Sequence, residues 1–209
     1  MTLQEKIADA KIIAVLTIDS AENAVPLAQT LLDNGICAME LTLRTPQAME
    51  SLARIVSEVP EMLAGVGTVI RPDQVREAKN NGAAFAVSPG TNRAVLQAAQ
   101  DEGLFFAPGI VTPSDIETAL EYDCRLMKFF PAETSGGLPH LRSMAAPYSY
   151  LGLKFIPLGG INENNLVHYL SDPLITAIGG SWIASPAEIR NADWNAIATK
   201  AKAASQLAG

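Results

Sequence analysis

The sequence has few of the residues that build metal centres or disulfide frameworks. Its 209 residues include two cysteines, Cys37 and Cys124, and two histidines, His140 and His168. The cysteines lack a CxxC spacing, so we expect two reduced thiols in a cytoplasmic protein. Both histidines fall in segments with helical periodicity, and no cluster of carboxylates accompanies them. The sequence therefore predicts no bound metal.

Positive charge and long apolar runs are also scarce. Fifteen Lys and Arg residues stand against 22 Asp and Glu residues, which gives a formal net charge of −7. This balance argues against broad electrostatic attraction to nucleic acid or to an anionic membrane. The longest apolar runs are much shorter than the roughly 18 residues of a membrane span, and no signal-peptide pattern opens the chain. An anionic substrate would therefore need local positive potential, from helix N-termini or from one or two placed cations.

Short apolar segments alternate with longer segments of helical periodicity along the chain. Segments rich in Ile, Val, Leu and Phe predict strands at residues 12–16, 38–43, 63–66, 84–87, 105–107, 126–130, 155–158 and 175–178. Helices are predicted to begin near residues 20, 46, 72, 92, 113, 138, 162 and 186, and an extra helix at about 3–10 precedes the first strand. The sixth of these helices, from Leu138, is expected to be interrupted by Pro139.

This repetition predicts a single α/β domain over residues 1–209. No linker rich in Pro, Gly or Ser separates the strand–helix units. Most of the strand segments are near-continuous apolar runs, as expected of strands covered by helices. Eight such units in this length predict a (β/α)8 TIM barrel with an extra N-terminal helix. An open doubly wound sheet is the alternative, because alternation alone does not establish closure.

Polar residues end the strand predicted at 38–43. Side chains alternate along a strand, so Glu40, Thr42 and Arg44 share one face while Leu41 and Leu43 take the other. Catalytic groups of such barrels lie at the C-terminal ends of the strands. If the leucines pack against helices, the polar groups point into the barrel mouth. The alternative is a surface strand end with an internal Glu–Arg pair.

One lysine of seven, Lys128, lies inside an apolar strand, in the sequence Leu-Met-Lys-Phe-Phe. The other six occupy helix-like or strand-entry positions, where a solvated ammonium is easily accommodated. Burial disfavours the charged form of a lysine and lowers its pKa, so Lys128 would offer a free amine as a nucleophile. The alternative is a structural lysine whose head group pairs with Glu40 or Glu133.

Glycine-containing turns follow three of the predicted strands. The pairs at 159–160 and 179–180 follow the seventh and eighth strands, where barrels of this class commonly bind phosphate. Glycine lets the backbone approach an anion closely, and the Ser181 hydroxyl can add a donor. Residues 65–67 form a further glycine-containing turn, with the Thr68 hydroxyl beside it.

Seven motifs occur in order along nearly the whole chain. They are ELTLRT (40–45), GVGTV (65–69), SPG (88–90), PGIVT (108–112), KFFPAE (128–133), GGI (159–161) and GGSW (179–182). Together they resemble the 2-keto-3-deoxy-6-phosphogluconate (KDPG) / 4-hydroxy-2-oxoglutarate (KHG) aldolase family. The resemblance implies a cofactor-free class I aldolase, an aldehyde-lyase that is usually a homotrimer. It acts on a small 2-keto acid, commonly KDPG, which yields pyruvate and glyceraldehyde 3-phosphate.

The resemblance also implies roles for individual residues. The lysine of KFFPAE, here Lys128, forms the Schiff base, and the glutamate of ELTLRT, here Glu40, transfers protons. The arginine of ELTLRT and the threonine of GVGTV, here Arg44 and Thr68, hold the carboxylate of pyruvate. Residues of the last two motifs hold the phosphate, and two others line the pocket around the lysine. These are Gly159, Gly160, Gly180 and Ser181 for the phosphate, and Pro89 and Phe130 for the pocket.

One departure from the family pattern concerns the substrate. Many KDPG-type members have threonine before the GGI turn, whereas this chain has Leu158, which cannot hydrogen-bond a substrate hydroxyl. The substrate therefore stays open between KDPG, its galactonate epimer, 4-hydroxy-2-oxoglutarate and another 2-keto-3-deoxy acid. Two other classes also remain. One is a phosphosugar isomerase or epimerase with Glu40 as the base, and the other is a non-catalytic phosphosugar-binding barrel.

Overall fold

A computed structural model describes residues 1–209, in which strands alternate with helices. The strands are β1 (Ile12–Leu16), β2 (Ala38–Thr42), β3 (Leu63–Gly67), β4 (Phe85–Val87), β5 (Phe105–Ala107), β6 (Gly109–Ile110), β7 (Leu126–Phe129), β8 (Lys154–Pro157) and β9 (Ile178–Gly180). The helices are α1 (Leu3–Ala10), α2 (Ala24–Asp33), α3 (Ala48–Glu58), α4 (Pro72–Asn80), α5 (Arg93–Asp101), α6 (Pro113–Leu120), α7 (Gly137–Ala145), α8 (Leu166–Leu170), α9 (Pro186–Arg190) and α10 (Trp194–Ala208). Every predicted strand except the last agrees with an observed strand to within one residue at each end.

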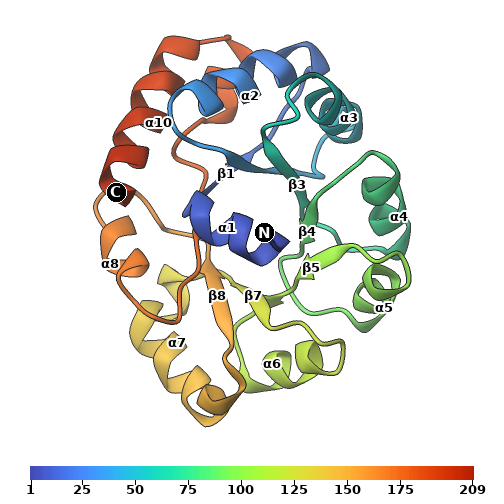
Figure 1. Cartoon of the computed structure of the whole chain (residues 1–209), viewed down its shortest axis with the longest axis vertical. Helices are drawn as coiled ribbons and strands as arrows, with labels where there is room; N and C mark the ends of the chain where they lie inside the picture. Colours follow the sequence, from blue (N-terminus) through green and yellow to red (C-terminus); the bar gives the residue numbers. More distant parts are fainter.

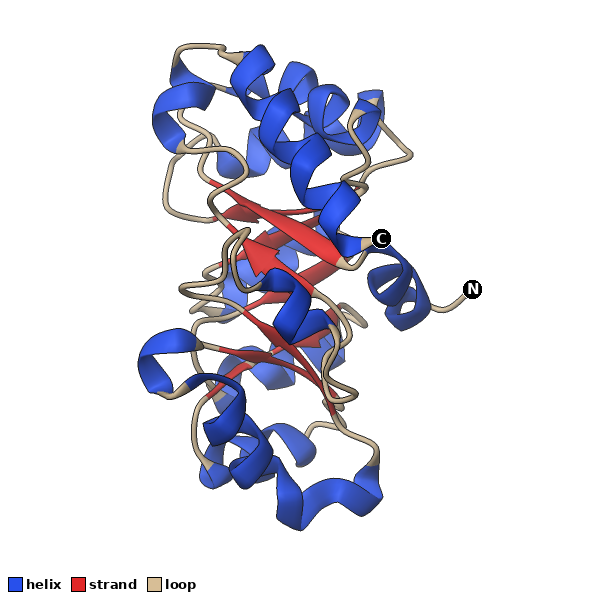
Figure 2. Cartoon of the chain, turned by 90° about the vertical axis from the view of Figure 1, so that its left-hand side faces the viewer, coloured by secondary structure: helices blue, strands red, loops and turns tan.

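The strands form two parallel ladders. Six strands pair in the order β5-β4-β3-β2-β1-β9, and three pair in the order β6-β7-β8. The larger sheet is curled, and helices α2 to α8 and α10 lie outside the strands (Figure 1). Helix α1 lies to one side of the strands, near the N-terminus (Figure 2). Because all the ladders are parallel, the C-terminal ends of the strands gather at one end of the molecule.

Local capping explains where several helices begin. Thr112 accepts a hydrogen bond from the backbone N–H of Asp115, whose carboxylate accepts from the Thr112 N–H in return. Ser185 and Glu188 form the same reciprocal pair at the start of α9. In both helices a proline occupies the first turn, where its missing N–H costs nothing. These starts depend on adjacent residues and are therefore predictable from sequence.

The last strand does not lie where it was predicted. The segment expected at 175–178 forms only an isolated bridge at Ile175, and the ladder with β1 begins at Ile178. Gly179 and Gly180, expected in a turn, therefore belong to β9. Apolar side chains occupy the space that these two glycines leave. A Cβ on Gly179 would lie 2.3 Å from Cγ of Leu158, and a Cβ on Gly180 would lie 1.9 Å from the Trp182 ring.

One helix prediction was also wrong. Pro139 does not interrupt α7, because it lies in the first turn, where a backbone N–H has no acceptor within the helix. The helix predicted to begin near residue 186 does begin there, as α9, and a further helix, α10, follows it. Between them Ala192 adopts a left-handed φ of 51°. Asp193 then caps α10 by accepting from the backbone N–H of Ala196 at 3.1 Å.

Buried apolar side chains form an outer and an inner cluster. The outer cluster contains 51 residues and includes Leu41, with Leu43 packed against it. The inner cluster consists of Ile7, Ile13, Ala38, Phe85, Val87, Ala107, Leu126, Ile156, Leu158 and Ala177. Ala38 and Leu126 thus point inward, and side chains two residues further along their strands do the same. This alternation directs Glu40 and Lys128 toward the interior, as predicted.

The structure shows two free thiols. The pKa of both Cys37 and Cys124 is raised mainly by burial, to about 11 for Cys124. No group of three or more His, Cys, Asp or Glu side chains is arranged to hold a metal ion. None of the helices has the length and apolar character that crossing a bilayer requires.

Candidate active site

Lys128 in β7 and Glu40 in β2 meet in the interior of the molecule. Lys128 Nζ lies 3.3 Å from Oε1 of Glu40, and the two side chains are 7% and 2% exposed. In every other ion pair of the chain at least one side chain is more than 20% exposed. Taking both charges out of water is costly. A catalytic role therefore explains the buried pair better than a contribution to the stability of the fold does. Glu133, the other partner considered for Lys128, makes no contact of this kind.

Two neighbours shape the space around this pair. The ring of Phe130 has its centroid 5.3 Å from Lys128 Nζ. Gly67, at the end of β3, faces Glu40, and a Cβ on that glycine would lie 1.7 Å from Oε1 of Glu40. The absence of a side chain at Gly67 therefore gives the carboxylate its position. The sequence predicted residues 65–67 to form a turn, whereas they are the last three residues of β3.

Arg44 is connected to the end of β1 by a chain of hydroxyl groups. The Thr42 hydroxyl donates to the carbonyl of Leu16 at 3.0 Å. It must therefore accept from Thr17, whose Oγ1 lies 2.9 Å away. Nη2 of Arg44 donates to Oγ1 of Thr17 at 3.2 Å. Thr17 was not predicted from the sequence. Its signal there was a polar residue directly after the strand predicted at 12–16.

Thr68 follows β3 in a strained backbone conformation. Its φ is +62°, which is unusual for a β-branched residue and is most common at functional sites. Pro89 follows β4 and lies close to β6, where a Cβ on Gly109 would lie 2.3 Å from the Pro89 carbonyl oxygen. The Ser88 hydroxyl, which is buried, donates to the Gly90 carbonyl at 2.6 Å and closes this turn.

The turn after β8 presents free backbone donors. Gly159 and Gly160 have φ values of +91° and +86°, which favour glycine. The Gly159 carbonyl accepts from the backbone N–H of Glu133. The Gly160 carbonyl accepts from the side-chain amides of Asn162 and Asn165 at 3.1 and 3.0 Å. The N–H groups of residues 159–161 make no hydrogen bond within the chain. Successive free N–H groups of this kind suit an anion.

One cavity of about 320 Å³ brings most of the predicted site residues together. Of the predicted site residues it contains Lys128, Glu40, Arg44, Thr68, Pro89, Phe130, Gly159, Gly160 and Ser181. Gly180 is not among the lining residues, and the neighbouring Gly179 takes its place. The reason is that the last strand, β9, ends at residue 180, whereas it was predicted to end at residue 178. Val15, Thr42, Leu158 and Ile161 complete the wall. The leucine that departs from the family pattern therefore lies in the site itself.

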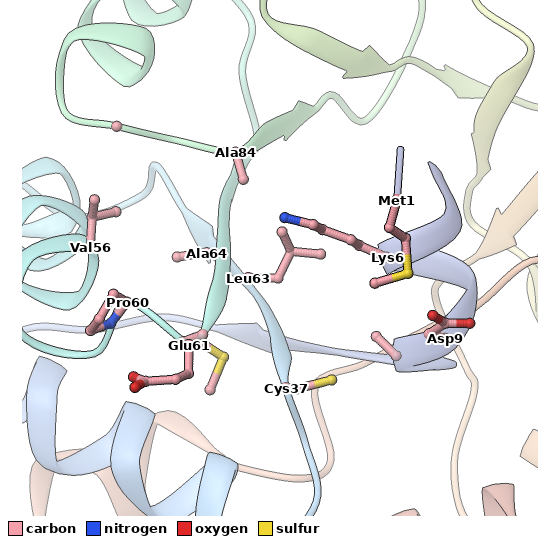
Figure 3. Close-up of a pocket in the computed structure, with 13 residues that line it drawn as sticks. Met1, Lys6, Asp9, Cys37, Val56, Pro60, Glu61, Leu63, Ala64 and Ala84 are labelled. Carbon is pink, nitrogen blue, oxygen red and sulfur yellow. The ribbon is translucent and has the colours of Figure 1, made fainter. Parts of the chain in front are cut away.

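A larger cavity, of about 670 Å³, lies elsewhere, beside α1 (Figure 3). Met1, Lys6 and Asp9 lie on one side of it, and Val56 and Pro60 lie on the other (Figure 3). It contains none of the predicted site residues. Its lysine is exposed at the surface. Size alone therefore does not identify the site. The smaller cavity combines a buried amine, a carboxylate and free backbone donors.

Comparisons with known proteins show which family this chain resembles. Residues 3–200 match the family described as KDPG and KHG aldolase. The chain is 38% identical to the 2-dehydro-3-deoxy-phosphogluconate aldolase of Treponema pallidum, over 100% of this chain and 99% of that one. It is 37% identical to the KHG/KDPG aldolase of Escherichia coli, over 92% and 90% of the two chains.

A solved structure is equally similar. The KDPG aldolase of Legionella pneumophila, with pyruvate captured as a covalent carbinolamine intermediate, superposes with a TM-score of 0.90. The two chains are 37% identical over 97% and 98% of their lengths. The family profile spans nearly all of this sequence, and the relatives match it over their own full or nearly full lengths. The chain therefore belongs to the KDPG and KHG aldolase family.

Proposed function

We propose that this chain is a class I aldolase that cleaves KDPG to pyruvate and glyceraldehyde 3-phosphate through an imine on Lys128. One observation supports this most strongly: the buried amine lies 3.3 Å from a buried carboxylate in a cavity. An amine attacks a ketone only when it is unprotonated, and Glu40 is placed to accept its proton. The family membership and the carbinolamine in the Legionella relative support the same chemistry.

The steps follow from ordinary imine chemistry. The amine of Lys128 adds to the C2 ketone, and loss of water from the carbinolamine gives an iminium ion. Glu40, directly or through a water, removes the proton of the C4 hydroxyl. The C3–C4 bond then breaks, its electrons move toward the iminium nitrogen, and the aldehyde leaves. The resulting enamine is protonated at C3, and hydrolysis of the iminium releases pyruvate and restores the amine.

The remaining wall residues bind the two ends of the substrate. Arg44 and Thr68 hold the carboxylate, and Pro89 and Phe130 confine the carbon chain beside the amine. The turn at 159–161 and Ser181 hold the phosphate through backbone and hydroxyl donors. Gly180, the other predicted phosphate residue, acts indirectly, since any side chain there would displace Trp182. Holding both ends sets C2 against the amine.

Leu158 bears on which substrate is preferred. It is buried, lines the cavity and has no polar atom to hydrogen-bond a hydroxyl at C4. Selection at C4 is then set by shape, and the galactonate epimer and 4-hydroxy-2-oxoglutarate remain candidates beside KDPG. Steady-state kinetics on both C4 configurations, with and without phosphate, test this point. Equal kcat/KM with and without phosphate would favour 4-hydroxy-2-oxoglutarate.

We also infer that residues 1–209 form a single closed (β/α)8 barrel, with α1 as an extra N-terminal helix. The inner apolar cluster supports closure, because side chains from both ladders share it. We propose a homotrimer in the cytoplasm, as the family resemblance and the free thiols suggest. Native mass spectrometry tests the trimer.

Borohydride trapping tests the imine. Reduction in the presence of pyruvate should add one reduced pyruvate unit to Lys128, located by peptide mass spectrometry. Lys128→Ala should abolish labelling and turnover. Labelling at Lys154 or Lys79 instead would refute the assignment. An absence of labelling would favour a phosphosugar isomerase or a non-catalytic binding protein.

A further inference from the structure

The loop after β7 packs directly against the glycine turn after β8. The backbone N–H of Glu133 donates to the Gly159 carbonyl at 3.0 Å, and the N–H of Ala132 donates to the Leu158 carbonyl at 2.7 Å. A Cβ placed on Gly160 would lie 2.6 Å from both Cβ and Cγ of Glu133. The turn therefore cannot shift toward this loop without displacing Glu133.

The side chain of Glu133 extends this contact to α8, the helix that follows the turn. Tyr169, which is buried in α8, donates its hydroxyl hydrogen to Oε1 of Glu133. Burial and then this hydrogen bond raise the pKa of the Tyr169 phenol, so the hydroxyl stays protonated at neutral pH. Asn165, directly before α8, donates to the Gly160 carbonyl. The turn is thus held from the β7 loop and from α8, and the Glu133–Tyr169 hydrogen bond joins the two.

We propose that Glu133 and Tyr169 form a positioning pair that holds the turn at 159–161 ready for the phosphate end of the substrate. The inference rests on the proposed function, because it concerns the phosphate of an aldol substrate. Neither residue lines the cavity. Their contribution should therefore appear in recognition of phosphate, while imine formation on Lys128 should proceed without them.

The charge of Glu133 gives a sharper expectation. A carboxylate next to an anion-binding turn opposes the anion unless its position is controlled. Glu133→Gln removes the charge and keeps an oxygen that can accept from Tyr169, so phosphate recognition should be kept or improved. Glu133→Ala removes the acceptor as well, and Tyr169→Phe removes the donor but leaves the charge. Both should weaken phosphate recognition.

The chain offers a matched control for the tyrosine. Tyr148 donates its hydroxyl to Glu117 at 2.9 Å, a second Tyr–Glu pair whose residues do not line the cavity. Tyr148→Phe makes the same chemical change away from the turn. We would measure kcat/KM for phosphorylated and unphosphorylated substrate, inhibition by inorganic phosphate, and borohydride trapping of pyruvate in all variants.

We expect Tyr169→Phe and Glu133→Ala each to lower the preference for phosphorylated substrate by about tenfold, mainly through KM, the order expected for one hydrogen bond. The double variant should lose little more than one single variant, because the residues act together. Borohydride trapping of pyruvate should be unchanged in every variant. Tyr148→Phe should also keep the wild-type preference for phosphorylated substrate.

Two results would overturn the inference. One is a phosphate preference in Tyr169→Phe and Glu133→Ala equal to that of Tyr148→Phe. The other is a loss in Glu133→Gln as large as in Glu133→Ala. If Tyr169→Phe does not fold, the Glu133→Ala variant still tests the pair, because Glu133 lies at an exposed position. Failure of the wild-type protein to trap pyruvate would instead contradict the proposed function.

Discussion

Replacing Gly67 by alanine tests whether the position of Glu40 controls proton transfer. The backbone at Gly67 does not have a positive φ, so alanine is compatible with its conformation. The added Cβ would lie 1.7 Å from Oε1 and 2.4 Å from Cδ of Glu40. Ordinary contacts between such atoms begin at about 3.4 Å. The added methyl group would therefore clash with the Glu40 carboxylate.

The expected loss can be worked from this overlap. The carboxylate has to withdraw by more than about 1 Å, and a misplacement of about 1 Å can cost on the order of 100-fold in rate. Complete loss of general acid–base catalysis costs about 10²–10⁴-fold. We therefore expect Gly67→Ala to lower kcat by about 100-fold or more. Imine formation with pyruvate should survive, since the Lys128 amine remains.

Three measurements separate this cause from general damage. Gly90→Ala is the matched control, because its Cβ would meet nothing within 4 Å. It should leave kcat nearly unchanged. In a Glu40→Ala background the clash is absent, so Gly67→Ala should cost less than about twofold more. Exchange of pyruvate methyl protons with solvent, followed by NMR, reports the proton transfer itself. Retention of a third or more of wild-type kcat, or a further large loss in the Glu40→Ala background, would refute the reasoning.

Three other predictions concern binding, metal dependence and acid stability. Thr17→Val breaks the hydroxyl chain to Arg44, so KM for the 2-keto acid should rise about three- to tenfold with little change in kcat. Exhaustive chelation should leave aldol cleavage intact, because the iminium ion accepts the electrons; loss of activity that a divalent ion restores would contradict this. Burial alone would raise the pKa of Glu188, but hydrogen bonds from Lys200 and Ser185 lower it from 4.5 to about 2. Its contribution to stability is therefore present above pH 4.5 and lost as the pH falls toward 2. The difference in Tm between wild type and Glu188→Gln should shrink over that window.

Local patterns in the sequence were enough for most elements and for the centre of the site. Strands such as β1 and helix starts such as α6 depend on apolar runs and caps made by adjacent residues. Alternation along a strand placed Glu40 on the face opposite Leu41. A charged residue inside an apolar run singled out Lys128. In each case the information lies within a few residues of the position predicted.

Contacts between distant segments decided the rest. Lys128 and Glu40 are 88 residues apart, and no periodicity specifies a 3.3 Å separation. The end of β9 depends on pairing with β1, so the sequence could not tell that Gly179, and not Gly180, faces the cavity. No local pattern pairs Tyr169 with Glu133, because the two residues are 36 positions apart in the sequence. A periodic pattern reports which side of an element is buried, whereas the partner on that side is chosen only when the whole chain packs.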